Sequence, residues 1–255
     1  MVTPWFHRLT IILAALAAVC PPAFAATTLV AVASNFTEPM NEIAEAFEKA
    51  SGHRAKLSFG SSGKFVAQIE NGAPFEVFLS ADTEKPAQLE TSKQAVPGSR
   101  FTYAIGKLVL WSAQPGLVDA QGAILNGGGF KHLALADPKL APYGAAAVEV
   151  LKNKGVLEKL RPLFVLGENI SQTHQFISTG NAELGFIALS QVIADGKIAE
   201  GSGWIVPDTL HAPIRQDAVL LNKGVENPAA PALLQFLKSA EARTIMQSYG
   251  YSLAD

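Results

Sequence analysis

Two short turns rich in hydroxyl and amide side chains each follow an apolar, strand-like run and precede a helical pattern. They are Ala33-Ser34-Asn35 and Gly60-Ser61-Ser62-Gly63. At the start of a helix the first backbone N–H groups lack a partner within the helix, and the helix dipole is positive there. Serine and asparagine donors at such a junction complete a site for an anion. The first ligand class that the sequence predicts is therefore a buried oxyanion.

The segments around these turns predict alternating strands and helices. Residues 28–33 are continuously apolar, as buried parallel strands are, and apolar residues at 36–47 recur at helical spacing. A second strand is expected at 55–59, a helix at 64–70 and a third strand at 77–80. This alternation is typical of α/β layers around a parallel sheet.

A second α/β set follows residues 101–112, a stretch long enough to pass from one sheet to another. It has expected strands at 132–136, 163–166 and 184–188, a helix from Tyr143, and a further helix after the turn Gly167-Glu168-Asn169-Ile170-Ser171. A strand at 214–221 returns to the first set. We therefore predict two lobes, residues 26–105 with 214–255 and residues 106–213. The ligand cleft is expected between them, where the carboxyl ends of the strands face each other.

The first 25 residues predict a secretory signal peptide. His7 and Arg8 precede a short apolar run, and Ala23-Phe24-Ala25 has the small-x-small pattern of a signal peptidase site. Export to the periplasm with cleavage near Ala25 is expected. Cys20, the only cysteine, would be removed, so a hydrophobic core rather than disulfides must stabilise the mature chain. Lipid attachment at Cys20 is the less favoured alternative, because Val19 fits the lipoprotein pattern poorly.

Composition excludes several classes of partner. The chain has 20 Lys and Arg against 22 Asp and Glu, a formal net charge of −2, and no basic patch that would favour nucleic acid. The histidines are scattered, with no pair at metal-ligand spacing, so no metal bound directly by side chains and no cofactor are expected. We expect a monomer.

The order of several motifs carries a resemblance to a known family. These motifs are Ala33-Ser34-Asn35-Phe36, then Ser58-Phe59-Gly60-Ser61-Ser62-Gly63, then Gln68-Ile69-Glu70-Asn71-Gly72-Ala73-Pro74, then Val77-Phe78-Leu79-Ser80-Ala81-Asp82, and finally Ala136-Asp137-Pro138. Through essentially the whole mature chain, the sequence resembles the periplasmic molybdate-binding proteins of ABC importers. The resemblance implies a type II periplasmic-binding-protein fold, two lobes that close by hinge motion on one oxyanion. It also implies delivery of molybdate, and of tungstate, to a membrane permease.

The resemblance also implies five ligand-binding positions. In the first lobe they are Ser34, Asn35 and Ser62, which supply polar donors. In the second lobe they are Tyr143, through its hydroxyl, and Ile170, through its backbone N–H. Some family members instead place a tyrosine after the strand that ends here at residue 188, where this chain has alanine. The sequence is similar to those members that carry the aromatic hydroxyl at the Tyr143 position.

Neutral donors suit molybdate and tungstate, which are fully deprotonated near neutral pH, so that every ligand oxygen accepts hydrogen bonds. Phosphate usually keeps one proton, its second pKa being about 6 to 7, and its site gains from a carboxylate acceptor. Glu168 is expected to point outward, because a buried dianion would repel it. Lys64 is expected on a solvated face. Whether Ser61 or Lys64 also contacts the ligand is left open.

Other interpretations remain at this point. Ser34, Asn35 and Ser62 could simply cap helices. A receptor of the same fold could take sulfate, which shares the chemistry but is smaller. An exported hydrolase or transferase acting on phosphorylated or sulfated substrates is the alternative from another class. We do not expect an enzyme, because the sequence contains no Walker spacing, no nucleophile elbow and no other recognisable catalytic set.

Overall fold

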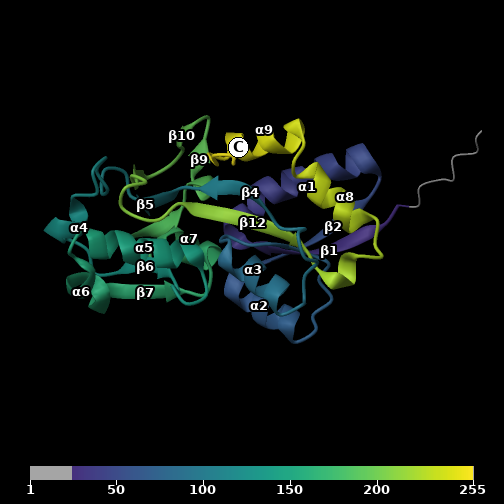
Figure 1. Cartoon of the computed structure of the whole chain (residues 1–255). Coiled ribbons are helices and arrows are strands. Elements are labelled where there is room, and N and C mark those ends of the chain that lie inside the picture. The colour runs from purple at the N-terminus through teal and green to yellow at the C-terminus, as the bar shows by residue number, and fades with distance from the viewer. Residues whose placement is uncertain (1–24, 255) are drawn as a thin grey trace, which may run out of the picture.

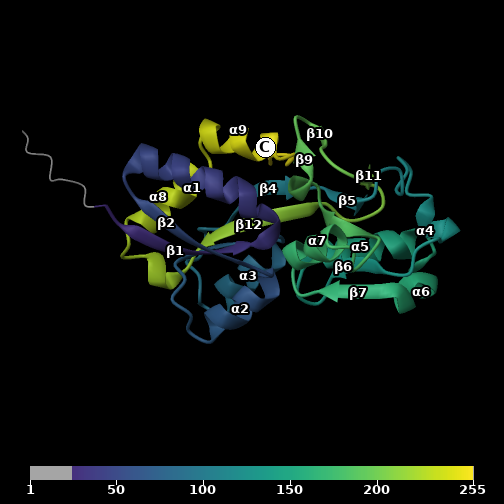
Figure 2. The same cartoon turned by 180° about the vertical axis from the view of Figure 1, so that it is seen from behind.

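The computed structural model describes residues 25–254, which form two lobes side by side (Figures 1 and 2). Nearly all of the predicted signal peptide, including Cys20, lies outside the described residues, as does residue 255. Within the described part, the strands form two five-stranded mixed sheets and a short hairpin of β9 (Ile193–Ala194) and β10 (Lys197–Ile198). No helix in this part of the chain is both long and apolar enough to cross a bilayer.

The first lobe is built on a sheet with strand order β2-β1-β3-β12-β4. Its strands are β1 (Thr27–Ala33), β2 (Arg54–Gly60), β3 (Val77–Leu79), β4 (Phe101–Gly106) and β12 (Ile214–Leu220). Strand β1 runs parallel to both β2 and β3, whereas β12 runs antiparallel to β3 and β4. The carboxyl ends of β1 and β2, which carry the two polar turns, therefore lie at the same edge of the sheet.

Helices cover both faces of this sheet (Figure 1). They are α1 (Thr37–Ser51), α2 (Ser62–Glu70), α3 (Glu84–Thr91), α8 (Ala229–Phe236) and α9 (Ala240–Ser248). Alternate side chains of a strand point to opposite faces. Val30 and Val32 accordingly join the core formed with α1, α8 and α9, while Ala31 joins the core with α2 and α3. Gly52, in the left-handed conformation with φ 73°, ends α1, since glycine adopts this conformation without steric cost.

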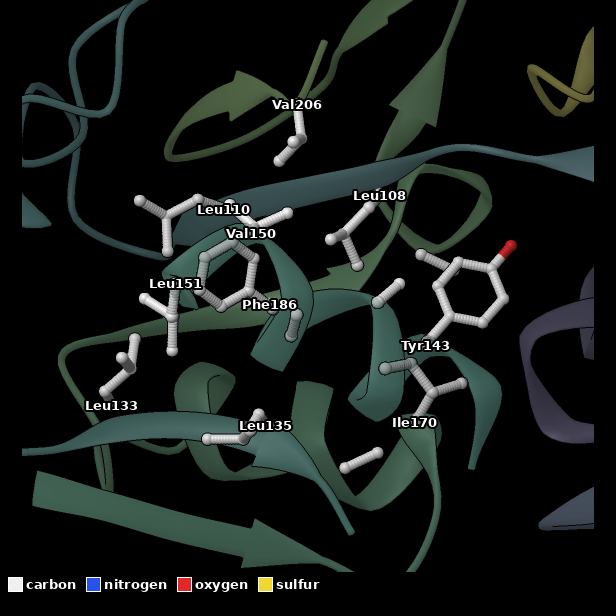
Figure 3. Close-up of a cluster of buried hydrophobic side chains, with 14 of the residues drawn as sticks. Leu108, Leu110, Leu133, Leu135, Tyr143, Val150, Leu151, Ile170, Phe186 and Val206 are labelled. Atoms are coloured by element: carbon white, nitrogen blue, oxygen red, sulfur yellow. The ribbon is translucent and has the colours of Figure 1, made fainter. Parts of the chain in front are cut away.

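The second lobe has the strand order β11-β5-β8-β6-β7. Its strands are β5 (Leu108–Ser112), β6 (Leu133–Ala136), β7 (Phe164–Gly167), β8 (Leu184–Ala188) and β11 (Ser202–Ile205), and its helices are α4 (Ile124–Gly127), α5 (Pro142–Asn153), α6 (Leu157–Leu160) and α7 (Ile170–Ser178). Leu108, Leu110 and Phe186 pack with α5 on one face (Figure 3). Ile187 packs with Ile177 of α7 on the other face.

The chain passes between the sheets twice. Strands β4 and β5 are separated by Lys107 alone, and residues 206–213 connect β11 to β12. The long stretch at 101–112 thus supplies one strand to each sheet, and β12 returns to the first sheet, as the sequence predicts. The lobe boundaries at 105/106 and 213/214 stay a prediction, because sheet membership does not define where two lobes separate.

The first α/β turns differ from prediction in detail. Helix α2 begins at Ser62 rather than at residue 64, because Ser61 is extended (φ −77°, ψ 143°) and the chain turns helical directly after it. A short 3-10 helix, η1 (Ser34–Phe36), lies between β1 and α1. Further 3-10 turns are η2 (Arg161–Leu163), η3 (Leu189–Gln191) and η4 (Asn222–Gly224). The earlier start of α2 and the η1 turn thus place Ser62 and Ser34 at the very start of a helix.

Candidate functional site

A small pocket lies where the two lobes meet. All five residues that the sequence singles out line it, and each is at least 95% buried: Ser34, Asn35, Ser62, Tyr143 and Ile170. The remaining lining residues are Ala33, Gly60, Ser61, Ala81, Ala141 and Pro142. Among these described residues none carries a charge. The pocket therefore combines polar donors from both lobes without a formally charged side chain.

Helix N-termini from both lobes converge on this pocket. Ser34 begins η1, which leads directly into α1, and Ser62 begins α2. From the second lobe, Tyr143 lies in the first turn of α5 and Ile170 is the first residue of α7. The free N–H groups and positive dipole ends of these helices favour an anion between them.

The helix starts have sequence-coded causes. Pro142 occupies the first position of α5, where its fixed φ is compatible with a helix and its missing N–H removes no bond. Asn169 caps α7, its side-chain oxygen accepting from the Gln172 N–H at 3.0 Å. This cap fixes the start of α7 at Ile170, which lines the pocket.

Ser62 and Ser61 present hydroxyl groups in different states. Ser62 Oγ accepts from the Ala81 N–H at 3.0 Å, so its own proton is free to be donated. Ser61 Oγ is buried and has no hydrogen-bond partner within the described residues. A buried hydroxyl without a partner costs free energy that a ligand oxygen would recover. The Gly-Ser-Ser-Gly turn itself gave the signal for Ser61, but the sequence alone did not distinguish its role from that of Ser62.

The Asn35 side chain is engaged within the protein. Its amide nitrogen donates to Gln216 Oε1 at 2.9 Å and to Tyr251 Oη at 3.0 Å. Its backbone carbonyl accepts from Tyr251 Oη and from Ser190 Oγ, each at 2.8 Å. Both N–H groups of the amide therefore have partners, and the donor that Asn35 can offer a ligand is its backbone N–H.

Gln216, which the sequence analysis missed, joins the two lobes behind the pocket. It is fully buried in β12; its Oε1 accepts from Tyr103 Oη at 3.0 Å and its Nε2 donates to Tyr143 Oη at 3.1 Å. The available signal was the run of polar residues Arg215, Gln216 and Asp217 in a returning strand that is otherwise apolar. Figure 3 shows the Tyr143 hydroxyl pointing away from the apolar cluster of the second lobe.

Burial keeps the tyrosines of this network neutral. It raises the pKa of Tyr143 and the pKa of Tyr103 well above the usual value of 10.0. It raises the pKa of Tyr251 to about 12. All three hydroxyls thus keep their protons at physiological pH, and Tyr143 can act as a hydrogen-bond donor.

Direct contacts between the lobes surround the pocket. The Gly63 N–H donates to the Leu140 carbonyl at 2.9 Å, and Ser171 Oγ donates to the Ser34 carbonyl at 3.2 Å. At the rim, Lys64 Nζ lies 2.6 Å from Glu168 Oε1, with 44% and 47% of these side chains exposed. Glu168 thus points outward, as predicted. Lys64 pairs with it and is not among the residues that line the pocket.

Metal ligation has no candidate in the described part of the chain. Within residues 25–254, no three His, Cys, Asp or Glu side chains gather closely enough to hold a metal ion. What the pocket can do chemically is donate hydrogen bonds to an anion from several directions.

Comparison with known proteins agrees with this geometry. The model of the bacterial extracellular solute-binding protein family matches residues 28–252. The molybdate-binding protein ModA of Azotobacter vinelandii is 59% identical over 229 residues, which cover 90% of this chain and 91% of that protein. The chain belongs to the family of molybdate-binding proteins. ModA of Rhodobacter capsulatus is 55% identical over 230 residues, 90% of each chain.

A solved structure supports the same family assignment. The periplasmic molybdate-binding protein of Azotobacter vinelandii superimposes with a TM-score of 0.86 at 44% identity, covering 89% of this chain and all of that one. The predicted two-lobed binding-protein fold is thereby confirmed. Since these relatives are named as binding proteins, the expectation that this chain is not an enzyme is confirmed as well.

Proposed function

We propose that the chain binds molybdate in the pocket between its lobes and delivers it to the permease of an ABC importer. The observation that carries the proposal is a buried, uncharged pocket at which helix N-termini from both lobes converge. Relatives at 59% and 55% identity that bear the name of molybdate-binding proteins support the choice of ligand. Tungstate, with the same charge and shape, is proposed as a second ligand.

We assign the donors to the groups that are free to act. Hydroxyl donors come from Ser34, Ser62 and Tyr143, and backbone N–H donors from Asn35 and Ile170. The proposal adds the unpartnered hydroxyl of Ser61 as a sixth donor. Fixed dipoles of this kind balance a buried dianion without the desolvation cost of a buried cation.

The donor set also predicts selectivity against phosphate. Monohydrogen phosphate carries a proton that needs an acceptor, and no carboxylate is among the described lining residues. A buried O–H without an acceptor costs about 1 to 3 kcal/mol. Sulfate meets the same donors, so discrimination against it would come from its smaller size.

Further elements of the proposal concern the setting of the protein. We propose that residues 1–25 direct export to the periplasm and are cleaved near Ala25, and that the mature protein acts as a monomer. The similarity to the periplasmic molybdate-binding protein of Azotobacter vinelandii supports this location.

The Ser62→Ala variant tests whether this helix-start serine binds the ligand or only supports the fold. Loss of a donor to a charged partner costs about 1.5 to 3 kcal/mol, so molybdate affinity should fall about 10- to 150-fold in titration calorimetry. Ser239→Ala is the matched control, because Ser239 caps α9 by accepting from the Ala242 N–H and is not in the pocket. It should lower the melting temperature and leave affinity unchanged. Equal affinities for both variants would remove Ser62 from the site.

A further inference from the structure

In the hydrogen-bond network behind the pocket, the donor and acceptor of each bond can be assigned by starting from a backbone carbonyl. A backbone carbonyl can only accept, and the Asn35 carbonyl receives the Tyr251 hydroxyl at 2.8 Å. The Tyr251 hydroxyl has one proton, which it donates either to this carbonyl or to Ser190 Oγ at 3.1 Å. Toward the Asn35 amide, Tyr251 can therefore only present its oxygen as an acceptor. The amide nitrogen of Asn35 is thereby oriented toward both Tyr251 and Gln216.

The orientation of Asn35 determines that of Gln216. The Asn35 nitrogen faces Gln216 Oε1 at 2.9 Å, and a reversed Gln216 amide would set two N–H donors against each other. Gln216 Nε2 must then face Tyr143, where it donates to Oη at 3.1 Å. Since Tyr143 Oη receives this hydrogen bond, its own proton cannot point at Gln216 and is left for the neighbouring Tyr251 hydroxyl or for a ligand in the pocket that Tyr143 lines.

We propose that Gln216 is a positioning residue that aims the hydroxyl proton of Tyr143 into the pocket and so makes Tyr143 a donor to the bound oxyanion. Gln216 is not among the described residues that line the pocket, and in this role it acts through Tyr143. The inference rests on the proposed function, because it needs Tyr143 to contact the ligand. It deepens that function by giving a physical reason for the preference for fully deprotonated anions.

A double-mutant cycle with molybdate as the probe tests the inference. Tyr143→Phe and Gln216→Met, a neutral replacement of similar length, should each weaken binding about tenfold or more in titration calorimetry. The double variant should bind no more weakly than Tyr143→Phe alone, because the other pocket residue that Gln216 contacts, Asn35, offers the ligand its backbone N–H and not the amide bonded to Gln216. A purely structural role of Gln216 would instead weaken binding further in the Tyr143→Phe background.

A second variant gives a signature that loss of packing would not produce. In Gln216→Glu, an ionised carboxylate cannot donate to Tyr143, which then turns its proton toward residue 216. Affinity should be low at about pH 8 and recover by about pH 5.5, as the buried carboxyl regains a proton and can donate. The wild type and Tyr143→Phe should show no such profile. Circular dichroism at both pH values confirms that each variant is folded.

The surroundings of position 216 keep this profile interpretable. The groups facing it are the hydroxyls of Tyr103 and Tyr143 and the amide of Asn35, and the Tyr251 hydroxyl lies next to both Asn35 and Tyr143. Burial raises the pKa of all three tyrosines, so none titrates between pH 5.5 and 8. The carboxylates of Asp217 and Asp82 lie on the Tyr103 side, paired with Arg100 at 2.6 Å and with Lys85 at 2.5 Å.

The outcomes separate the inference from the function on which it rests. Unchanged affinity in Gln216→Met, with weakened binding in Tyr143→Phe, overturns the inference and leaves Tyr143 as a ligand contact. The inference is also overturned if the fold losses of affinity in the two single variants multiply in the double variant. Unchanged affinity in Tyr143→Phe removes both the inference and that contact. If the wild type fails to bind molybdate, the proposed function itself is wrong.

Discussion

At the scale of single residues, the pocket is built from neutral donors whose protons do not titrate near neutral pH. Serine hydroxyls and backbone N–H groups keep their protons throughout the physiological range, and burial raises the pKa of Tyr143 well above 10.0. The raised pKa extends the range in which Tyr143 is neutral, so its donor role is complete below its ordinary pKa and is lost only when pH rises through the elevated value.

A pH profile of binding follows from these groups. Molybdate affinity of the wild type should change less than about twofold between roughly pH 6.5 and 9, because no group at the pocket gains or loses a proton there. Titration calorimetry in buffers of matched ionic strength measures it. A tenfold change centred near pH 6 to 7 would show that a histidine or a raised carboxylate takes part, contrary to the donor set.

The sequence could identify the residues that line the pocket, but not which chemical group of each residue is free to donate a hydrogen bond. Ser34, Ser62, Tyr143 and Ile170 follow from helix starts and the family resemblance, and the structure brings them to one pocket. The sequence could not predict that the Asn35 amide bonds within the protein, nor that Gln216 bonds to both Asn35 and Tyr143. These bonds depend on partners 181 positions apart in the chain, Asn35 and Gln216, and no local pattern encodes such a contact.

At the scale of elements, local patterns predicted most of the fold because strands and helix starts are encoded by neighbouring residues. The strand at 184–188 and the stop of α1 at Gly52 follow directly from apolar runs and glycine. The η1 turn could not be predicted in this way, because a single 3-10 turn between a strand and a helix is too short to show a periodicity of its own. What positions the site is the close approach of β4, β12 and α5, which only the folded chain reveals.

Gly106, the last residue of β4, tests that approach. A Cβ at this position would clash with the Tyr143 hydroxyl and would lie 2.6 Å from Gln216 Nε2. Gly106→Ala should therefore displace Tyr143 and weaken molybdate binding about tenfold or more, the cost of one donor to a charged partner.

Gly127→Ala is the matched control, because nothing lies within 4 Å of its Cβ position and its φ is not positive. It should leave affinity and melting temperature nearly unchanged. Full molybdate affinity in Gly106→Ala would contradict the described packing of Tyr143 against β4.

At the scale of the whole molecule, the two lobes bind each other around the pocket and would have to separate for a ligand to enter. Backbone and serine contacts join them close to the pocket, and the ion pair of Lys64 with Glu168 joins them at the rim. Hinge motion between lobes is the established way in which such proteins close around a ligand. The rim pair is nearly half exposed, so solvent screens it and it contributes less than about 1 kcal/mol.

The Glu168→Gln variant measures the importance of this rim pair. Removing the charge should weaken molybdate binding less than about fivefold, with a smaller effect at high salt, because exposed ion pairs contribute little. Calorimetry at low and high ionic strength is the measurement. A loss of affinity as large as that expected for Ser62→Ala would contradict this, because it would make Glu168 as important for binding as a residue of the pocket.

The central claim, a cage of donors for a fully deprotonated oxyanion, is tested most directly by calorimetric titration of the mature protein with molybdate in the presence and absence of excess phosphate. We predict one molybdate bound per chain, with an affinity that phosphate leaves unchanged. Displacement of molybdate by phosphate at comparable concentrations, or the absence of molybdate binding, would contradict it.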